Sequence, residues 1–187
     1  MNIAIFASGN GTNFENITRY FADSQDVKVS LMVCNKANAN VIKRAEKLKV
    51  PSVCFPAKEW KTGENVLQEL QSKDIDFIVL AGFLLLVPEL IINEYSGRIV
   101  NIHPALLPKF GGKGMYGSHV HEAVLKSLAK ESGITIHYVN KKYDAGQIIK
   151  QVKCNIDDNE TVESLEAKIH ALEKEYYPKV LEKLLIR

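Results

Sequence analysis

The chain has 187 residues, of which 46% are hydrophobic and 25% charged, a composition typical of one globular domain with a full-sized core. Its formal net charge of +2, with lysines scattered singly, excludes a strongly basic surface, so we expect no nucleic-acid partner. No stretch approaches the roughly 20 apolar residues of a membrane span, and the N-terminus lacks the features of a signal peptide. Cys34, Cys54 and Cys154 lie among apolar residues, which predicts buried thiols in the cytoplasm and no disulfide framework.

The first predicted element is an apolar strand, Ile3–Ala7, which ends in the turn Ser8-Gly-Asn-Gly-Thr-Asn13 before a helix. A glycine turn between strand and helix aims backbone N–H groups at an anion. The turn is not the dinucleotide fingerprint, since Phe14 occupies the position of the third glycine, and it lacks the lysine of a Walker loop. It therefore favours a single phosphate. A plain helix cap by Thr12 or Asn13 is the alternative.

Buried strands alternate with amphipathic helices through the next part of the chain. The apolar runs predict strands at Val27–Cys34, Val50–Phe55 and Asp76–Ala81, with helices at Val41–Leu48 and Lys58–Ser72 between them. Such alternation is typical of an α/β fold, here a doubly wound, mostly parallel, Rossmann-like sheet with helices on both faces. Right-handed crossovers would bring the carboxyl ends of these strands to one edge of the sheet.

An apolar segment, Phe83–Val87, follows the strand at Asp76–Ala81. Gly82 and Pro88 bracket it, so it does not continue as a long strand. Two interpretations stay open: the segment belongs to the core, or it forms the wall of a pocket for a flat aromatic ligand.

The apolar residues Ile99, Val100 and Ile102 predict a buried strand, and two polar residues, Asn101 and His103, interrupt and follow this run with no packing reason to be there. Residues two apart on a strand point to the same face, and Pro104 holds His103 in an extended conformation. At the carboxyl end of a parallel strand, that face opens on the crevice where α/β proteins bind ligands. The alternative is a strand end with a satisfied core amide and a surface histidine.

Four glycines within Phe110–Gly117 indicate a loop that either closes over a site or is a simple turn. The following helix carries His119 and His121, which resemble a metal-binding pair, but no suitable third ligand lies nearby and we expect no metal. Two later strands, Gly133–Val139 and Gln147–Val152, are close enough in sequence for a hairpin, which predicts an antiparallel edge to the sheet.

Asp144 lies in the connection of this hairpin, just before an Ala-Gly pair, where a turn-forming Asx residue is the simplest interpretation. The functional alternative is a carboxylate at the sheet edge that orients His103 and raises its pKa. Within the first strand of the hairpin, Thr135 and His137 alternate with apolar residues and are expected on an exposed face.

A long amphipathic helix is predicted from Thr161 to Leu184, and Pro178 should break or kink it. The chain contains no internal repeat, low-complexity tract or linker-like composition. We therefore interpret residues 1–187 as a single domain.

Three segments together resemble the folate-dependent phosphoribosylglycinamide formyltransferases of purine biosynthesis. They are Ser8-Gly-Asn-Gly-Thr-Asn13, Asn101-Ile-His-Pro-Ala-Leu-Leu-Pro108 and Asp144-Ala-Gly-Gln-Ile-Ile149. The second, with a downstream Asp, is shared by all formyltransferases that use 10-formyltetrahydrofolate, whereas the glycine turn points to the glycinamide ribonucleotide branch. The resemblance covers essentially the whole chain.

The resemblance implies that the formyl group of 10-formyltetrahydrofolate, a co-substrate, passes to the amine of 5'-phosphoribosylglycinamide by direct attack. Asn101 would donate a hydrogen bond to the oxygen that gains negative charge, an interaction of ~3–4 kcal/mol by analogy with other single donors. His103 would share that role or pass protons, and Asp144 would orient His103 or hold a relaying water. Neither a covalent intermediate nor a metal is needed.

The resemblance also implies binding residues at matched positions. Gly11, Thr12 and Asn13 would hold the phosphate, and His170 and Glu173 would contact the rest of the ribonucleotide. The residues expected around the folate are Lys58, Leu84, Leu85, Leu86, Val87, Asn101, Asn140 and Asp144. Leu85 and Lys58 stand where the family commonly has Arg, and the Phe110–Gly117 loop is longer than in many members.

On this basis residues from about 1 to 100 form a phosphate- and ribonucleotide-binding half, and residues from about 101 to 187 form the catalytic and folate half. The expected partners are the two small-molecule substrates, with neither nucleic acid nor membrane. The expected assembly is a monomer or a weak homodimer in the cytoplasm.

Three alternatives remain open at this point. A 10-formyltetrahydrofolate hydrolase would use the same three polar residues, but such proteins normally carry an N-terminal regulatory domain, and Met1 begins directly at the first strand. A formyltransferase acting on tRNA or a sugar nucleotide would normally have an extra C-terminal domain. A non-catalytic phosphosugar-binding module would use only the glycine turn and would leave Asn101, His103 and Asp144 unexplained.

Overall fold

Seven strands form one sheet at the centre of the molecule, and the computed structural model describes residues 1–186 of the chain. Five apolar strands run parallel: β1 (Asn2–Phe6), β2 (Lys28–Cys34), β3 (Ser52–Cys54), β4 (Phe77–Leu80) and β5 (Ile99–His103). Two antiparallel strands complete the sheet: β6 (Glu131–Tyr138) and β7 (Ile148–Asn155). The order β3-β2-β1-β4-β5-β6-β7 confirms the predicted doubly wound sheet with an antiparallel edge.

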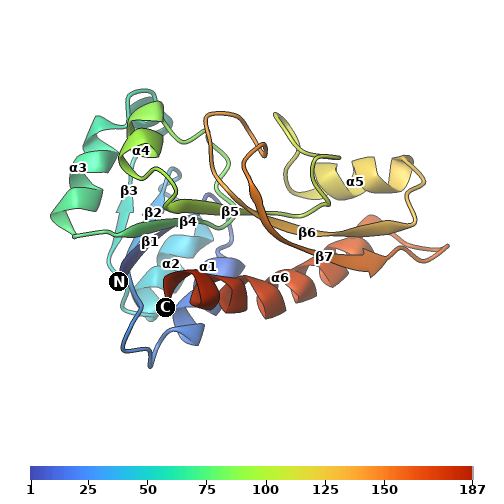
Figure 1. Cartoon of the computed structure of the whole chain (residues 1–187), viewed down its shortest axis with the longest axis horizontal. Helices are drawn as coiled ribbons and strands as arrows, with labels where there is room; N and C mark the ends of the chain where they lie inside the picture. Colours follow the sequence, from blue (N-terminus) through green and yellow to red (C-terminus); the bar gives the residue numbers. More distant parts are fainter. Residues whose placement is uncertain (187) are drawn as a thin grey trace.

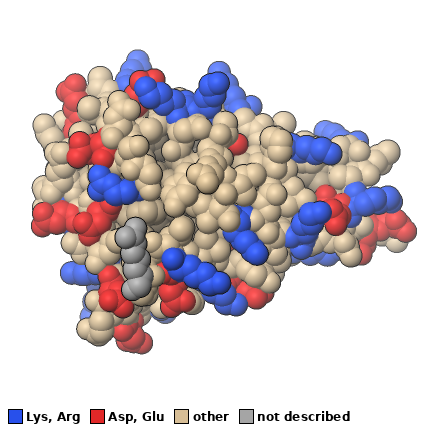
Figure 2. Space-filling model, viewed as in Figure 1, with Lys and Arg blue, Asp and Glu red and all other residues tan. Residues whose placement is uncertain are grey.

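Helices cover both faces of the sheet (Figure 1). One face is covered by α1 (Thr12–Tyr20), α2 (Asn40–Lys47) and α6 (Val162–Leu185), and α5 (Ser118–Lys126) packs against α6. The other face is covered by the 3-10 turn η1 (Ala57–Trp60) together with α3 (Glu64–Ser72) and α4 (Glu89–Glu94). No helix within residues 1–186 is long and apolar enough to cross a membrane. On the face shown in Figure 2, charged side chains of both signs surround a mostly uncharged centre.

The strand order places a topological switch point between β1 and β4, where successive crossovers run in opposite directions along the sheet. In such folds ligands bind in the crevice outside the carboxyl ends of these strands. Two hydrogen bonds fix the two loops that leave this edge. Ser8 N donates to Gly82 O at 3.0 Å, and Leu84 N donates to Ser8 Oγ at 2.9 Å.

Two predicted helices differ from expectation for identifiable reasons. The segment 58–72 is interrupted, because Gly63 adopts a left-handed φ of 80° between η1 and α3. In contrast, α6 runs through Pro178 without a break. Proline cannot donate to the carbonyl four residues earlier, but Asn16 Nδ2 supplies that bond to Lys174 O at 2.8 Å. The short helix α4, which follows Pro88, was not anticipated from the sequence.

Every fourth residue of α6 faces the core. This buried stripe consists of Leu165, Ile169, Glu173, Tyr177, Leu181 and Leu185. Such spacing is what an amphipathic helix requires, and burying the five apolar members stabilises the docking of α6. Glu173 is the exception, since a carboxylic acid in an apolar stripe costs free energy unless it has a partner. It therefore marks the position where α6 reaches a polar site.

Candidate active site

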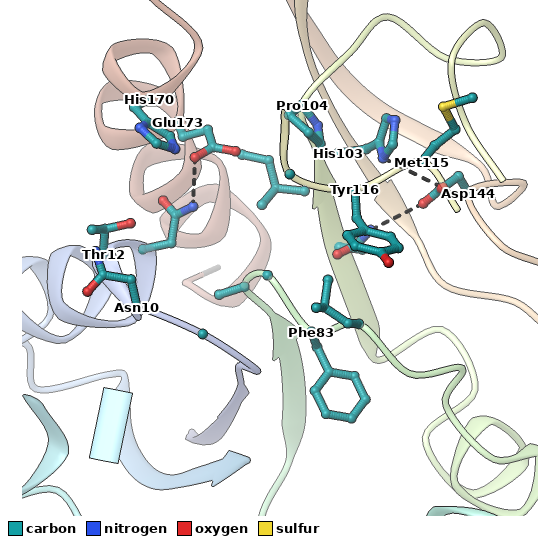
Figure 3. Close-up of a pocket in the computed structure, with 18 of the residues that line it drawn as sticks. Asn10, Thr12, Phe83, His103, Pro104, Met115, Tyr116, Asp144, His170 and Glu173 are labelled. Atoms are coloured by element: carbon teal, nitrogen blue, oxygen red, sulfur yellow. Dashed lines mark hydrogen bonds and ion pairs between the residues drawn. The ribbon is translucent and has the colours of Figure 1, made fainter. Parts of the chain in front are cut away.

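A pocket of about 620 Å³ opens at the carboxyl ends of β1, β4 and β5. Figure 3 shows His170 and Glu173 on one side of it, His103 and Asp144 on the other, and Tyr116 between them. Nine of the residues predicted from the sequence line this pocket: Gly11, Thr12, Asn13, Leu84, Asn101, His103, Asp144, His170 and Glu173. The structure therefore joins the glycine turn and the Asn-His-Asp group in one cavity.

The three predicted catalytic side chains converge at the end of β5. Asn101 and His103 both lie on β5, two residues apart, as expected. Asp144 approaches from the β6–β7 connection, where its Oδ2 lies 3.5 Å from His103 Nδ1. Its Oδ1 accepts a long hydrogen bond of 3.5 Å from Asn101 Nδ2. Asp144 thus contacts both residues, which the Asx-turn interpretation alone does not require.

His103 is almost fully buried, and its two ring nitrogens face acceptors. Nε2 donates to Phe110 O at 2.7 Å, and Nδ1 faces the Asp144 carboxylate. Two acceptors favour a doubly protonated ring, but burial opposes the charge. Burial is the larger effect and lowers the pKa of His103, although Asp144 and the Phe110 carbonyl act upward. Asp144 thus acts on this pKa in the expected direction, but burial outweighs it and the net shift is downward.

Asp144 is held as a carboxylate in a strained backbone conformation. Its φ of 49° is left-handed, a conformation that Asp tolerates better than most residues and that recurs at functional sites. Burial acts to raise the pKa of Asp144. The nearby His137 ring, the charge of His103 and the N–H of Gly112, at 2.9 Å from Oδ2, outweigh burial and lower this pKa below its usual value.

His137 is a fourth polar member of this group, and sequence reasoning missed it. The side chains of Thr135 and His137 were expected on an exposed face, but both are buried. His137 Nδ1 donates to Tyr138 O at 2.8 Å, which leaves Nε2 facing Asn101 Nδ2 at 3.3 Å and Asp144 Oδ1 at 3.7 Å. The ring therefore contacts two of the predicted catalytic side chains at once. Only the pairing of His137 with Asn101 across β5 and β6 could have indicated this role.

Thr135 supports the segment that follows His103. Its Oγ1 donates to Ala105 O at 2.7 Å and accepts from Leu107 N at 3.0 Å. Gln151 Nε2 adds hydrogen bonds of 2.9 Å to both Leu107 O and Thr135 Oγ1. The next peptide bond, Leu107–Pro108, is cis. These bonds connect β6 and β7 to the loop that covers the histidine.

The stability of the fold is expected to decrease between about pH 7.5 and about pH 5.5, partly because of His103. Its pKa is lowered from 6.5 in the folded chain, so between the folded pKa and 6.5 the unfolded chain binds more protons. The contribution of neutral His103 to the free energy of unfolding is therefore complete above that window, and it is lost as the pH falls through the window. Urea unfolding at both pH values measures the difference, which should shrink in His103→Asn. An unchanged difference in this variant would contradict the assignment.

The glycine turn presents the unpaired end of α1 to the pocket. The helix begins after Gly11, whose φ of 77° is left-handed, and no side chain caps it. The cap by Thr12 or Asn13 that was an alternative is therefore absent, and the first N–H groups of α1 lack intrahelical acceptors. A Cβ on Gly11 would lie 2.4 Å from Val41 Cγ2. This turn thus needs glycine, and its free N–H groups suit an anion.

Asn13 and Glu173 connect the glycine turn to α6. Asn13 Nδ2 donates to Glu173 Oε2 at 2.9 Å, and Glu173 is only 8% exposed. Burial raises the pKa of Glu173, while Asn13 and the neighbouring His170 act to lower it. A buried carboxyl with one protein donor has remaining acceptor capacity for a ligand hydroxyl. His170, one turn earlier on α6, is exposed at the same wall of the pocket.

Arg44 of α2 fixes the glycine turn through hydrogen bonds to Asn10. Its Nε donates to Asn10 O at 2.7 Å and its Nη2 to Asn10 Oδ1 at 3.1 Å, while Nη1 pairs with Glu15. Asn40 Nδ2 also donates to Asn10 Oδ1, at 2.7 Å. These contacts make Arg44 a positioning residue for the turn.

Replacing Arg44 with Gln is expected to raise KM for the ligand of the glycine turn roughly tenfold, the effect of losing one charged hydrogen bond. The turnover number should change little, because Arg44 does not contact the residues at the end of β5. Lys43→Gln is the matched control, since Lys43 is exposed on the same helix. Steady-state kinetics with each substrate varied in turn test this prediction, and an equal rise in both KM values would contradict it.

The apolar loop after β4, for which core and pocket-wall interpretations were open, has side chains of both kinds. Phe83 packs into an aromatic cluster, 4.5 Å from Trp60 and 5.5 Å from Phe6 between ring centroids. Val87 is also in the core, whereas Leu84 and Leu86 are 37% and 43% exposed. Alternate side chains therefore anchor the loop and project from it.

Five residues predicted around the folate do not line the pocket: Lys58, Leu85, Leu86, Val87 and Asn140. Val87 is buried and Leu85 packs against the same core, so their side chains anchor the loop to the core. Lys58 is exposed on η1. Asn140 folds its own loop, because Nδ2 donates to Ala145 O at 3.0 Å and Oδ1 accepts from Lys142 N at 2.9 Å.

The pocket also contains side chains that sequence reasoning left unassigned. Tyr116 of the glycine-rich loop lies in it, as Figure 3 shows, and Met115 of the same loop also lines it. Gly112 of the same loop donates to Asp144, so the loop position is coupled to the carboxylate. Within residues 1–186 no group of three or more His, Cys, Asp or Glu side chains is arranged for a metal ion, and the three cysteines are free.

Comparison with known proteins agrees with this geometry. Residues 1–181 match the formyl transferase family. The phosphoribosylglycinamide formyltransferase of Bacillus subtilis (strain 168) is 40% identical over 187 residues, which cover 97% of this chain and 93% of the relative. The crystal structure of the Bacillus halodurans enzyme of that name has a TM-score of 0.91 at 40% identity, covering 100% of this chain and 96% of the other. The Streptococcus pneumoniae TIGR4 structure has a TM-score of 0.87 at 36% identity, covering 98% of both chains. This chain belongs to the formyl transferase family.

Proposed function

We propose that this chain is a phosphoribosylglycinamide formyltransferase, which transfers the formyl group of 10-formyltetrahydrofolate to the amine of 5'-phosphoribosylglycinamide in purine biosynthesis. One observation carries the proposal: the anion-binding end of α1 and the Asn101–His103–Asp144 group line the same pocket. An enzyme that formylates an amine on a phosphorylated sugar needs an anion site at the phosphate end of its substrate and polar catalytic groups at the amine end. The names of the relatives agree with this substrate pair.

The chemistry follows from the polar group at the end of β5. Attack of the neutral amine on the formyl carbon forms the new C–N bond and places negative charge on the formyl oxygen. Asn101 Nδ2 and the His103 ring are the donors available to that oxygen. The bond between the formyl carbon and folate N10 then breaks, as one proton leaves the attacking nitrogen and one reaches N10. Asp144, as a carboxylate next to His103, accepts and returns that proton, directly or through water.

The pocket suggests how the substrates are arranged. The phosphate is assigned to the N–H groups of Gly11, Thr12 and Asn13, and the ribose to Glu173 and His170. The folate is assigned to the side of the pocket near Leu84, Asn101 and Asp144. Any folate contacts outside the pocket are assigned to five other predicted residues: Lys58, Leu85, Leu86, Val87 and Asn140. Because Glu173 and His170 come from α6, the ribonucleotide site draws on both predicted halves of the chain.

The proposal is tested by the absorbance change of a 10-formyl folate donor, with and without the ribonucleotide. Turnover that requires the ribonucleotide is the expected result. Folate turnover in its absence would instead identify a hydrolase, and no turnover with either would overturn the proposal. Sedimentation of the same preparation tests the expected monomer or weak homodimer.

A further inference from the structure

We propose that His121 is a ribonucleotide-binding residue, which supplies a ring nitrogen to an uncharged polar group between the phosphate and the amine of the substrate. The inference rests on the proposed function and adds a residue to it. His121 lies on α5 and is 2% exposed, and neither the family resemblance nor the chemistry at the end of β5 uses it.

The observation that carries the inference is an unpartnered atom. Within residues 1–186 three buried side-chain polar atoms have no hydrogen-bond partner: Asn35 Oδ1, His121 Nδ1 and Ser132 Oγ. Of these three residues, only His121 lines the pocket. A buried polar atom without a partner opposes folding, so such an atom beside a cavity indicates a group that is paired when the cavity is filled.

The surroundings of His121 locate it between the two ends of the pocket. Glu166 and His170 lie on α6, which packs against α5, and His103 lies at the end of β5; all three influence the pKa of the His121 ring. All four residues line the same cavity.

The protonation state of the ring narrows the class of partner. Burial lowers the pKa of His121, as do His170 and His103, whereas Glu166 acts in the opposite direction. At neutral pH the ring is therefore uncharged, with one nitrogen donating and the other accepting. An uncharged imidazole suits a ribose hydroxyl or the glycinamide amide, which can complement either role. It does not suit the phosphate, which prefers charged donors and backbone N–H groups.

Two variants and a control test the inference by kinetics. His121→Leu removes both ring nitrogens, whereas His121→Asn keeps a polar group near the position of Nδ1. The expected result is a rise of roughly tenfold in KM for the ribonucleotide in the Leu variant, with kcat and the folate KM changed less than about threefold. The Asn variant should recover most of the loss. His119→Phe is the matched control on the exposed side of α5 and should match the native chain.

A measurement on the native chain decides the matter even if the Leu variant does not fold. Ring nitrogen resonances of 15N-histidine-labelled protein are recorded with and without saturating ribonucleotide. The Nδ1 resonance of His121 should shift on adding the ribonucleotide and stay in place on adding inorganic phosphate. An unmoved resonance, or an unchanged ribonucleotide KM in the Leu variant, would overturn the inference. Native protein that neither binds nor formylates the ribonucleotide would instead overturn the proposed function itself.

Discussion

Replacing Asp144 with Asn is expected to lower kcat by a factor on the order of 10²–10⁴, with little change in KM for the ribonucleotide. Its two carboxylate oxygens face four groups: Asn101 Nδ2, Gly112 N and one ring nitrogen each of His103 and His137. An amide offers only one acceptor oxygen, and its NH2 group would face donors. The variant would lose both the charge that accepts the proton and the arrangement of the neighbouring side chains.

Steady-state kinetics of this variant need a control that changes charge equally. Asp158→Asn provides it, because the Asp158 side chain is 96% exposed and forms only a long surface ion pair with Lys130. We expect this control to keep kcat within about twofold of the native value, since exposed ion pairs contribute little. An Asp144→Asn enzyme with more than half of the native kcat would remove the carboxylate from the mechanism.

Replacing Gly146 with Ala is expected to destabilise the fold by about 3 kcal/mol, at the upper end of overpacking effects. An added Cβ would lie 1.6 Å from the backbone oxygen of Tyr138 and 3.5 Å from His137 Nδ1. Tyr138 N donates to Gln147 O at 2.9 Å, so the clash cannot be relieved without opening the start of the β6–β7 hairpin. Because Asp144 is two residues away, activity should fall as well.

Urea unfolding measures this prediction, with Gly9→Ala as the control. A Cβ added at Gly9 would meet no atom within 4 Å, and Gly9 does not adopt a left-handed φ, so the control should unfold within about 0.5 kcal/mol of the native chain. Equal unfolding midpoints for the two variants would show that the hairpin tolerates a side chain at position 146.

The parallel part of the fold is readable from the sequence because each buried strand is a short apolar run between turn signals. The residues at which helices end or are interrupted were harder to predict from the sequence. Whether Pro178 ends a helix depends on a partner for one carbonyl, and that partner, Asn16, lies 158 residues before the Lys174 carbonyl in the chain. Likewise, Gly63 interrupts a helical pattern that hydrophobic spacing alone would continue. Local patterns carry no information on such long-range contacts.

The candidate site divides in the same way. Asn101, His103 and Asp144 were identifiable because polar residues in or beside apolar strands are conspicuous, and the structure brings them together. The role of His137 could not be identified from the sequence. The alternating pattern of its strand matches a half-exposed strand, but in the fold β7 and the Asp144 loop bury His137. The direction of the His103 pKa shift also depends on the balance of burial against a nearby charge, and only the folded geometry supplies both.

The helix α6 has a consequence for how the enzyme is made. It contributes Glu166, His170 and Glu173 to the pocket, and Tyr177 Oη donates to Leu80 O at 2.9 Å on the central strand β4. The parallel strands and the glycine turn are translated long before this helix. The last helix to be synthesised therefore completes both one face of the core and the pocket, so the pocket exists only after α6 has docked on the sheet.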